Sequence, residues 1–407
     1  MRSEQIGIVG LGYVGLPLAI HFAQKNAKVL GFDIDISRIN QLSKGDSPIP
    51  DVSSSKLLQF LDSDHLCFSS DPNKLSECQI IIICVPTPLK SSGEIELTAL
   101  EGAADLVTEY APSGALIINE STSFPGTLRE VFQTRLKAKR GSEVFYLATA
   151  PERVDPGSHF AFEDIPRVVG GIDTLSSEKA VNFYSQFFKN VHQVATPEVA
   201  EMSKLLENTF RQVNISLVNE INELCQRVGI DTREVIAAAA TKPYGFMKFL
   251  PSAGIGGHCI PVDPEYLQYF ASRSGERLKV VSAASAVNDE MGESIVRRVV
   301  RHLGGSNPLS ALILGVAYKP NIPDIRDTPA EAILQALNSQ AVSVDWHDPL
   351  VEQWHGKKSS SLKDRSWEVG IVVTAHDLLD IELAKTKCNK IFDCTGRYSH
   401  IPEIVQI

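Results

Sequence analysis

Short apolar runs alternate with segments of helical periodicity along the first half of the chain. The pattern starts at QIGIVG and continues with KVLGFDID, IIIICVPTP, ALIINEST and VFYLATAPE. Each run ends in a turn or polar residue, as strands do when helices connect them into a parallel sheet. The pattern predicts an α/β fold with a doubly wound parallel sheet of the Rossmann type.

A second, weaker copy of the pattern lies near the carboxyl end. Its apolar runs are ALILGVAYKP, AVSVDWHDP, VGIVVTAHD and KIFDCTG, with a predicted helix, AEAILQALNSQ, between the first two. Such sheets bind ligands beyond the carboxyl ends of their strands. Two Rossmann-like domains therefore predict two nucleotide-type ligands.

One long helix is expected between the two copies. Thr196 can cap it, Pro197 suits the first helical position, and the apolar periodicity continues to Val228, just before Gly229. About thirty residues at 1.5 Å each give a helix of roughly 45 Å. This length predicts a connector between two lobes, with a small helical domain around it and a possible role as a dimer surface.

Composition and charge exclude several classes of protein. The 407 residues predict two or three domains, and 43% hydrophobic with 22% charged residues is ordinary for a soluble globular protein. A net charge of -10 and the lack of a basic block argue against nucleic acid as a partner. The longest apolar runs are shorter than the about 20 residues needed to cross a membrane, so no membrane insertion is expected.

The cysteines and the amino terminus predict a cytoplasmic protein. The seven cysteines are an odd number without a CxxC pair, which favours neither a disulfide framework nor a bound metal. A reducing compartment fits this usage. The first residues enter an apolar strand directly and do not resemble a signal peptide.

The segment GLGYVG, residues 10–15, follows a strand and opens a helix, the context in which GxGxxG indicates a dinucleotide site. Its glycines allow a tight turn and let the backbone approach a pyrophosphate. Asp33 ends the next strand, where an acid binds ribose hydroxyls and favours NAD over NADP. Arg38 could serve a phosphate or be a solvated surface charge.

The segment GIGGHCIPVDP, residues 254–264, has three glycines before Cys259 and an acid, Asp263, four residues after it. The glycines allow a close approach of backbone and ligand. For an isolated cysteine, a small buried core residue is the commoner interpretation. The segment alone leaves both interpretations open.

Polar residues on the long helix and at two strand ends add candidates for a site. Lys204, Asn208 and Arg211 share one helix face by spacing and could meet an anionic ligand, although a solvated stripe is the alternative. The loops EST (120–122) and PERVDPG (151–157) follow predicted strands, where α/β proteins collect ligands.

Seven motifs, in order, resemble those of the UDP-glucose/UDP-N-acetylhexosamine 6-dehydrogenase family over essentially the whole chain. They are GLGYVGLP, CVPTP, EST, PERVDPG, EMSKLLENTFRQVN, GIGGHCIPVDP and GVAYKPNIPDIRDTP. The resemblance implies an NAD-binding Rossmann domain at 1–195, a central helical dimerisation domain with the catalytic Lys and Cys at 196–305, and a UDP-sugar-binding Rossmann-like domain at 306–407. It also implies a homodimer through the central helix.

The resemblance implies roles for individual residues by motif position. The implied NAD contacts are Gly10, Gly12, Tyr13, Val14, Gly15, Asp33, Arg38, Thr87, Thr122 and Arg326. The implied nucleotide-sugar contacts are Arg153, Val154, Lys204, Asn208, Arg211, Gly256, Tyr318 and Lys319. The implied catalytic residues are Cys259 as nucleophile, Asp263 as its acid/base partner, Lys204, Asn208, Glu152 and Thr122.

The implied reaction is a four-electron oxidation of the C6 hydroxymethyl of a UDP-sugar to the uronate, for surface polysaccharide precursors. A thiolate at Cys259 would hold the aldehyde as a thiohemiacetal, and loss of a second hydride would leave a thioester that water cleaves. Lys204 with Asn208 would stabilise the oxyanion, and Glu152 with Thr122 would orient the water. Either Lys204 or Asp263 could take the alcohol proton.

The predicted substrate is UDP-N-acetylglucosamine, with UDP-N-acetylmannosamine and UDP-glucose as alternatives. PERVDPG, KPYGFM and GGHCIPVDP resemble the first branch. Lys248 and Ser252-Ala253 depart from that branch, which usually has Pro and Gly-Pro there. His258 is expected to be structural or to shape the substrate pocket, because glucose-specific relatives have no histidine there.

Two other classes remain open. The β-hydroxyacid dehydrogenases also combine a GxGxxG domain with a helix that carries Lys and Asn four residues apart, but they need no catalytic cysteine and lack a second Rossmann-like domain. Cys259 and the motif at 317–326 argue against that class. A non-catalytic protein that senses NAD or a UDP-sugar would tolerate Cys259→Ser.

Overall fold

The computed structural model describes residues 4–49, 52–61, 63, 65–90, 92–154 and 160–407. The chain divides into two compact units, the first formed by 1–207 with 265–275 and the second by 208–264 with 276–407. The division falls inside two helices, α7 (Pro197–Val228) and α9 (Asp263–Arg273). Each unit is built around its own sheet.

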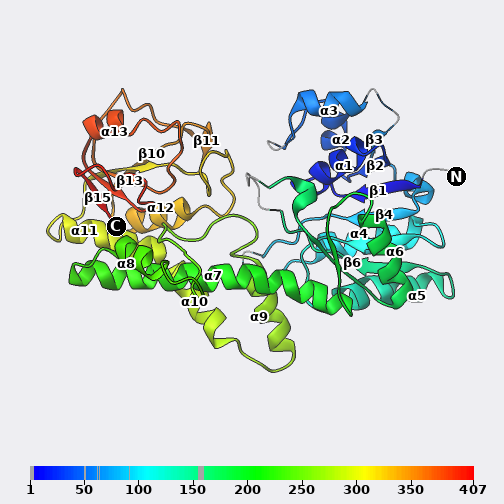
Figure 1. The fold of residues 1–407 in the computed structure, drawn as a ribbon. Coiled ribbons are helices and arrows are strands. Elements are labelled where there is room, and N and C mark those ends of the chain that lie inside the picture. The colour runs from blue at the N-terminus through cyan, green and yellow to red at the C-terminus, as the bar shows by residue number, and fades with distance from the viewer. Residues whose placement is uncertain (1–3, 50–51, 62, 64, 91, 155–159) are drawn as a thin grey trace. The chain divides into compact units, whose positions relative to one another are not determined.

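The first unit contains an eight-stranded sheet in the order β3-β2-β1-β4-β5-β6-β7-β8 (Figure 1). Neighbouring strands are parallel except β6 and β7, which are antiparallel. The order of the first six strands is that of a dinucleotide-binding Rossmann sheet. The strands are β1 (Gln5–Val9), β2 (Lys28–Phe32), β3 (Leu66–Ser69), β4 (Ile80–Ile83), β5 (Leu116–Asn119), β6 (Tyr146–Thr149), β7 (Arg167–Gly171) and β8 (Val191–Gln193).

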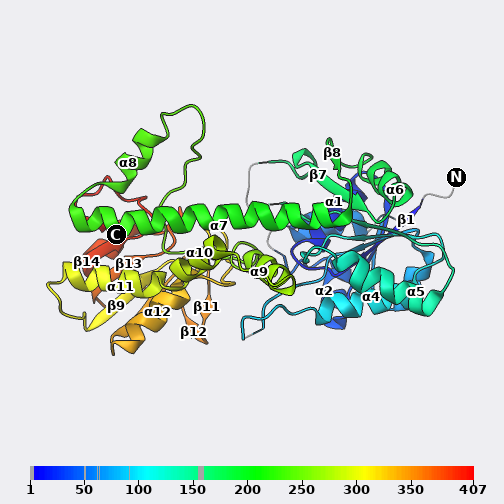
Figure 2. The ribbon, with the colours of Figure 1, turned by 90° about the horizontal axis from the view of Figure 1, so that it is seen from below.

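Helices cover both faces of this sheet. The helices are α1 (Gly15–Gln24), α2 (Ile36–Ser43), α3 (Ser54–Leu61), α4 (Thr98–Tyr110), α5 (Thr134–Arg140) and α6 (Thr174–Tyr184), with shorter helical turns η1 (Pro72–Glu77), η2 (Leu128–Gln133) and η3 (Phe162–Asp164). One core takes side chains from α1, α2, α3 and α6, and the other from α4, α5 and η2. Figure 2 shows α4 and α5 side by side.

The four isoleucines of β4 show why the apolar runs form strands of this sheet. Ile80 and Ile82 pack into one core, whereas Ile81 and Ile83 pack into the other. Successive side chains of a strand point to opposite faces, so a strand covered by helices on both sides is apolar throughout.

The second unit contains a five-stranded, entirely parallel sheet in the order β10-β9-β13-β14-β15. Its strands are β9 (Ser310–Leu314), β10 (Ser343–His347), β13 (Trp367–Val372), β14 (Cys388–Asp393) and β15 (Ile404–Gln406), and β11 (Gln353–Trp354) pairs with β12 (Lys357–Lys358) in a separate hairpin. Its other helices are α8 (Thr232–Ala239), α10 (Lys279–Asp289), α11 (Met291–His302), α12 (Pro329–Ser339) and α13 (Ile381–Lys387). Helices α11 and α12 cover one face and α13 the other.

The structure confirms the predicted α/β class with two Rossmann-like sheets. The long helix begins at Pro197 and ends at Val228, the bounds that the sequence predicts. The antiparallel strand β7, the edge strands β3, β8 and β15, and the β11–β12 hairpin were not predicted. The division of the chain at residues 195 and 305 stays a prediction.

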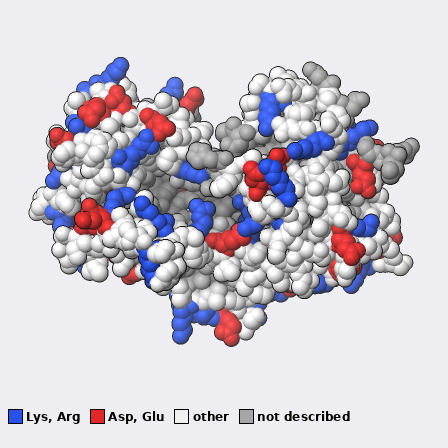
Figure 3. Space-filling view, viewed as in Figure 1, with Lys and Arg blue, Asp and Glu red and all other residues white. Residues whose placement is uncertain are grey.

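Charged side chains of both signs are interspersed on the face shown in Figure 3. No helix in the described part of the chain is long and apolar enough to cross a membrane.

Candidate functional site

The three glycines of the first turn have three different environments. A Cβ on Gly10, whose φ is +94°, would lie 2.5 Å from the carbonyl oxygen of Cys84. A Cβ on Gly15 would lie 1.8 Å from the carbonyl oxygen of Gly10, whereas a Cβ on Gly12 would have no atom within 4 Å. The outer glycines therefore serve the turn and its packing, and Gly12 faces open space in which a pyrophosphate could approach the backbone.

Asp33, at the end of β2, lies against this turn. Its Oδ2 accepts a hydrogen bond from the backbone N–H of Leu11 at 2.9 Å, and its Oδ1 accepts one from Asp35 at 3.0 Å. Arg38 donates to Oδ2 of Asp33 at 3.2 Å. The guanidinium of Arg38 is therefore ion-paired with the acid expected to bind ribose.

The other predicted NAD contacts of the first unit lie around the carboxyl edge of the sheet. Thr87, after β4, is buried, and its carbonyl oxygen accepts a hydrogen bond from the Tyr266 hydroxyl at 3.3 Å. The half-buried Thr122 follows β5. Tyr13, partly exposed, and Val14 stand just before α1.

A buried ion cluster lies behind the loops that end β5 and β6. Nη1 of Arg167 is 3.2 Å from Oε2 of Glu120 and 2.7 Å from Oε2 of Glu152. The Tyr184 hydroxyl donates to Oε1 of Glu120. Burial raises the pKa of Glu120 to about 7, although Arg167 opposes this. Burial alone would raise the pKa of Glu152, but the charges of Arg167 and Lys204 outweigh it and lower that pKa.

The loop after β6 is held by the same acid. Oε1 of Glu152 accepts hydrogen bonds at 2.6 Å from the backbone N–H groups of Arg153 and Val154. The buried Lys204 donates from Nζ to the carbonyl oxygen of Glu152 at 2.5 Å. Arg153 pairs with Glu207 at 2.7 Å. The structure therefore brings four predicted residues together here, and residues 155–157 of the PERVDPG motif lie outside the described residues.

Glu201, one turn before Lys204, fixes the start of α7. Its carboxylate accepts hydrogen bonds from the backbone N–H groups of Gly126 (2.6 Å) and Leu128 (3.0 Å). Burial raises the pKa of Glu201 to about 8, although these two donors lower it. The contact ties α7 to the loop that follows Thr122.

In the second unit, the glycine-rich segment leads to the predicted nucleophile just before α9. Cys259 is exposed, and its carbonyl oxygen accepts a hydrogen bond from the backbone N–H of Asp263 at 2.9 Å. The buried carboxylate of Asp263 accepts a hydrogen bond from Nδ2 of Asn208 at 2.5 Å. The structure thus brings these three predicted residues together.

The loop after β9 packs on the same glycines. A Cβ on Gly257, whose φ is +84°, would lie 2.7 Å from the ring of Tyr318. A Cβ on Gly256 would lie 2.7 Å from the carbonyl oxygen of Asp327. The backbone N–H of Gly257 donates to the carbonyl oxygen of Arg326 at 3.3 Å. Gly256, Tyr318 and Arg326, three predicted site residues, therefore lie close together in this unit.

The remaining predicted residues of the second unit differ in their exposure to solvent. Arg211 is exposed on α7, whereas Lys319 and His258 are half-buried. The Arg326 guanidinium pairs with Asp324 at 2.6 Å. Lys248, which departs from the resembled branch, is exposed.

The sequence analysis did not identify three residues that the structure places at or near these loops, Arg167, Tyr184 and Asp348. Arg167 begins the apolar run RVVGG, and a charged residue at the start of a buried strand is a signal for a buried ion pair. Asp348 directly follows β10 and accepts backbone hydrogen bonds from Val316 (2.7 Å) and Ala317 (3.2 Å). Its position matches that of Asp33 in the first sheet.

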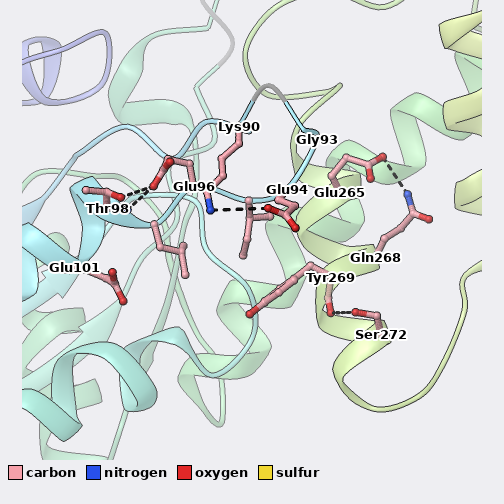
Figure 4. Close-up of a pocket in the computed structure, with 12 residues that line it drawn as sticks. Lys90, Gly93, Glu94, Glu96, Thr98, Glu101, Glu265, Gln268, Tyr269 and Ser272 are labelled. Atoms are coloured by element: carbon pink, nitrogen blue, oxygen red, sulfur yellow. Dashed lines mark hydrogen bonds and ion pairs between the residues drawn. The ribbon is translucent and has the colours of Figure 1, made fainter.

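One cavity of about 610 Å³ lies in the first unit, and none of the described residues that line it is a predicted site residue (Figure 4). Its lining includes four glutamates and one lysine, Lys90, which pairs with Glu94. A mostly acidic lining repels phosphate groups. This cavity therefore does not suit a dinucleotide or a UDP-sugar.

Three models of one protein family match the chain. The NAD binding domain of the UDP-glucose/GDP-mannose dehydrogenase family matches residues 4–188. The central domain of that family matches residues 198–290, and its UDP binding domain matches residues 312–396.

Individual proteins of known name are similar over most of their length. The chain is 34% identical over 363 residues to the UDP-N-acetyl-D-glucosamine 6-dehydrogenase of Pseudomonas aeruginosa, covering 86% of this chain and 84% of that one. It is 34% identical over 352 residues to the UDP-N-acetyl-D-mannosamine dehydrogenase of Methanocaldococcus jannaschii, covering 85% and 79%. The structure of the UDP-D-ManNAc dehydrogenase from Pyrococcus horikoshii matches with a TM-score of 0.89 and 30% identity over 99% of both chains.

Proposed function

The chain belongs to the UDP-glucose/GDP-mannose dehydrogenase family and is an NAD-dependent UDP-sugar dehydrogenase, and from this premise we propose that it oxidises C6 of a UDP-N-acetylhexosamine to a carboxylate through Cys259. The observation that carries the proposal is the setting of this cysteine. Its side chain is exposed after a glycine pair covered by Tyr318, and Asp263 follows it at the start of α9.

The first unit fits NAD at the turn of residues 10–15. Gly12 leaves room for the pyrophosphate, the amino end of α1 favours its charge, and Asp33 would accept hydrogen bonds from the ribose hydroxyls. Thr87 and Thr122 lie at the same sheet edge as Asp33. When bound, NAD supplies the acceptor for one hydride in each of two successive oxidations.

Cys259 retains the half-oxidised sugar. Its sulfur adds to the aldehyde carbon and forms a thiohemiacetal, which loses the second hydride and becomes a thioester. Water then breaks the carbon–sulfur bond, giving the carboxylate and restoring the thiol. Asp263, held by Asn208, moves protons to and from the oxygen on this carbon. Lys204 supplies positive charge for the developing oxyanion.

The proposed substrate is UDP-N-acetylglucosamine. The PERVDPG, KPYGFM and GGHCIPVDP segments support this choice, as does the relative from Pseudomonas aeruginosa. The relative from Methanocaldococcus jannaschii is also 34% identical to this chain, and it is named as a UDP-N-acetyl-D-mannosamine dehydrogenase. UDP-N-acetylmannosamine is therefore the second candidate, and the difference is the configuration at C2 of the sugar.

The test is to offer UDP-N-acetylglucosamine, UDP-N-acetylmannosamine and UDP-glucose separately with NAD and to count the NADH formed per sugar. We expect about two NADH for each UDP-N-acetylglucosamine consumed, because an alcohol-to-acid oxidation through a covalent intermediate removes two hydrides. About one NADH per sugar, with free aldehyde released, would contradict the mechanism.

Cys259→Ala is expected to abolish acid formation while UDP-sugar binding, measured by calorimetry, survives. Cys67→Ala is the matched control, because Cys67 is also an exposed free cysteine but lies on β3. Normal turnover of the Cys259→Ala enzyme would reject the assigned nucleophile.

A further inference from the structure

Arg167 lies in direct contact with both Glu120 and Glu152. The side chain of Arg167 is 1% exposed, and both carboxylates are buried as well. Burying a charge is costly unless a partner of opposite charge accompanies it. Loss of Arg167 would therefore remove the cation that pairs with both buried acids and leave Glu152 with the nearby charge of Lys204.

The direction of β7 explains how Arg167 reaches this position. Strand β7 runs antiparallel to β6, with Ala148 opposite Gly171 and Thr149 opposite Gly170. The first residue of β7, Arg167, therefore lies at the carboxyl edge of β6, where Glu152 follows. In a strand parallel to β6, the first residue would lie at the opposite edge of the sheet.

Aromatic rings hold the guanidinium in place. Its carbon lies 4.4 Å from the ring centroid of Phe188, 5.4 Å from that of Phe162 and 5.8 Å from that of Tyr184. A flat, delocalised cation can stack on such rings and bridge two carboxylates at once. A lysine ammonium is a compact charge, so it would stack on the rings and bridge the two carboxylates less well than the guanidinium.

A chain of contacts connects Arg167 with Lys204. Arg167 holds one oxygen of Glu152, and the other oxygen fixes the backbone of Arg153 and Val154. The carbonyl oxygen of Glu152 accepts a hydrogen bond from Lys204. The position of the Lys204 ammonium thus depends on a backbone that Arg167 anchors.

We propose that Arg167 is a positioning residue of the oxidation, which holds Glu152 and its loop so that Lys204 keeps its catalytic position. This inference rests on the proposed function, because it gives Lys204 and Glu152 their roles in that reaction. Arg167 itself is buried behind the loop and acts through Glu152.

Arg167 also sets the charge of the cluster. Glu152 faces Arg167, Lys204, Glu120 and Cys84, and Glu120 faces Tyr184 in addition. Without Arg167, burial and the neighbouring acid would raise the pKa of Glu152. The ionised form of Glu152 would then be reached only at higher pH, so activity would need a higher pH.

The experiment compares Arg167→Lys and Arg167→Met with the wild-type enzyme under UDP-N-acetylglucosamine and NAD. We expect kcat of Arg167→Lys to fall about tenfold to a hundredfold, since small misplacements of catalytic groups have effects of this size. The KM for NAD should change less than about twofold, because the turn at residues 10–15 is untouched. In Arg167→Met, the acid limb of the kcat profile should move to higher pH, because the cation that lowers the pKa of Glu152 is lost.

The matched control is Arg135→Lys, because Arg135 also pairs with two acids, Glu101 and Asp105, but at the surface. Its kinetics should equal those of the wild type.

If Arg167→Met does not fold, Arg167→Lys still tests the inference, because it keeps the charge and loses the bridging geometry. A kcat and pH profile of Arg167→Lys equal to wild type would overturn the inference. Absence of wild-type turnover on every UDP-sugar would instead reject the proposed function.

Discussion

The glycines of the first turn show what a motif does and does not predict at the scale of single residues. GxGxxG predicts a dinucleotide site, but the letters do not say which glycine serves the ligand. The structure distinguishes them, because added methyl groups on Gly10 and Gly15 would meet backbone oxygens and one on Gly12 would meet nothing. Substitutions of Gly10 and Gly15 should therefore affect folding, and a substitution of Gly12 should affect NAD binding.

Gly15→Ala and Gly12→Ala form a pair that tests this distinction. Gly15→Ala should lower the free energy of unfolding by about 1–3 kcal/mol, the usual cost of forcing an extra methyl group into a packed site. Gly12→Ala should keep wild-type stability and raise the KM for NAD roughly tenfold, about 1.4 kcal/mol of binding free energy. Urea unfolding and NAD titration measure the two effects. Equal behaviour of the two variants in both assays would refute the assignment.

At the scale of elements, the second sheet repeats two features of the first sheet, a glycine hydrogen bond after its first strand and an aspartate after its second strand. Gly315 after β9 donates its N–H to His347 at 2.8 Å, as Gly10 after β1 donates to Phe32 at 2.8 Å. An aspartate follows each second strand. Asp348 differs from Asp33 because it also accepts a hydrogen bond from His376 at 3.0 Å. This repeat was predicted from the apolar runs, whereas the hydrogen bonds of Asp348 were not.

Asp348→Asn should destabilise the second sheet in a pH-dependent manner. Burial alone would raise the pKa of Asp348, but hydrogen bonds from His376 and from backbone N–H groups lower it to about 2 from 3.8. A pKa below that of the unfolded chain stabilises the fold above pH 3.8, and this contribution is lost as pH falls toward 2. We expect a loss of about 2 kcal/mol at pH 6 and less at pH 3.

Urea unfolding followed by tryptophan fluorescence measures this effect, because the three tryptophans, Trp346, Trp354 and Trp367, all lie in the second unit. Asp377→Asn is the control, since Asp377 is an exposed acid in the same unit that pairs with Arg397. A loss of equal size at pH 6 and pH 3 would show that the ionised carboxylate is not the cause.

Sequence patterns predicted the elements with strong periodicity and missed those that depend on distant partners. The apolar runs located the central strands, and Pro197 with Gly229 marked the ends of α7. The short edge strands have little apolar signal, and the apolar run of β7 does not indicate its direction in the sheet. The partners of Arg167 are far from it along the chain, so its role could not be read from spacing. Whether the predicted site residues act as proposed stays a prediction.

At the scale of the whole molecule, α7 has an inverted distribution of polar and apolar side chains. Its buried polar residues are Glu201, Lys204, Thr209, Gln212, Ser216, Asn219 and Asn222. Its exposed apolar residues are Val199, Met202, Leu206, Phe210, Leu217, Ile221, Leu224 and Val228. A helix that packs on its own domain normally turns its apolar stripe inward. Part of this polar face is satisfied within the chain, for example by Ser216 donating to the carbonyl oxygen of Ala284 at 2.8 Å, whereas Oγ1 of Thr209, Oε1 of Gln212 and Nδ2 of Asn219 have no hydrogen-bond partner among the described residues.

An outward apolar stripe with spacings of three, four and seven residues is typical of a helix that packs on another helix, so we expect a homodimer through α7. Leu217→Arg should give a folded monomer in sedimentation velocity at micromolar concentration, because a charge would be buried in the proposed interface and exposed in the monomer. Leu309→Arg is the matched control, since Leu309 is exposed just before β9 and outside α7, and it should leave the dimer intact. A wild-type monomer, or a Leu217→Arg dimer of unchanged stability, would remove α7 as the interface and leave its inverted faces unexplained.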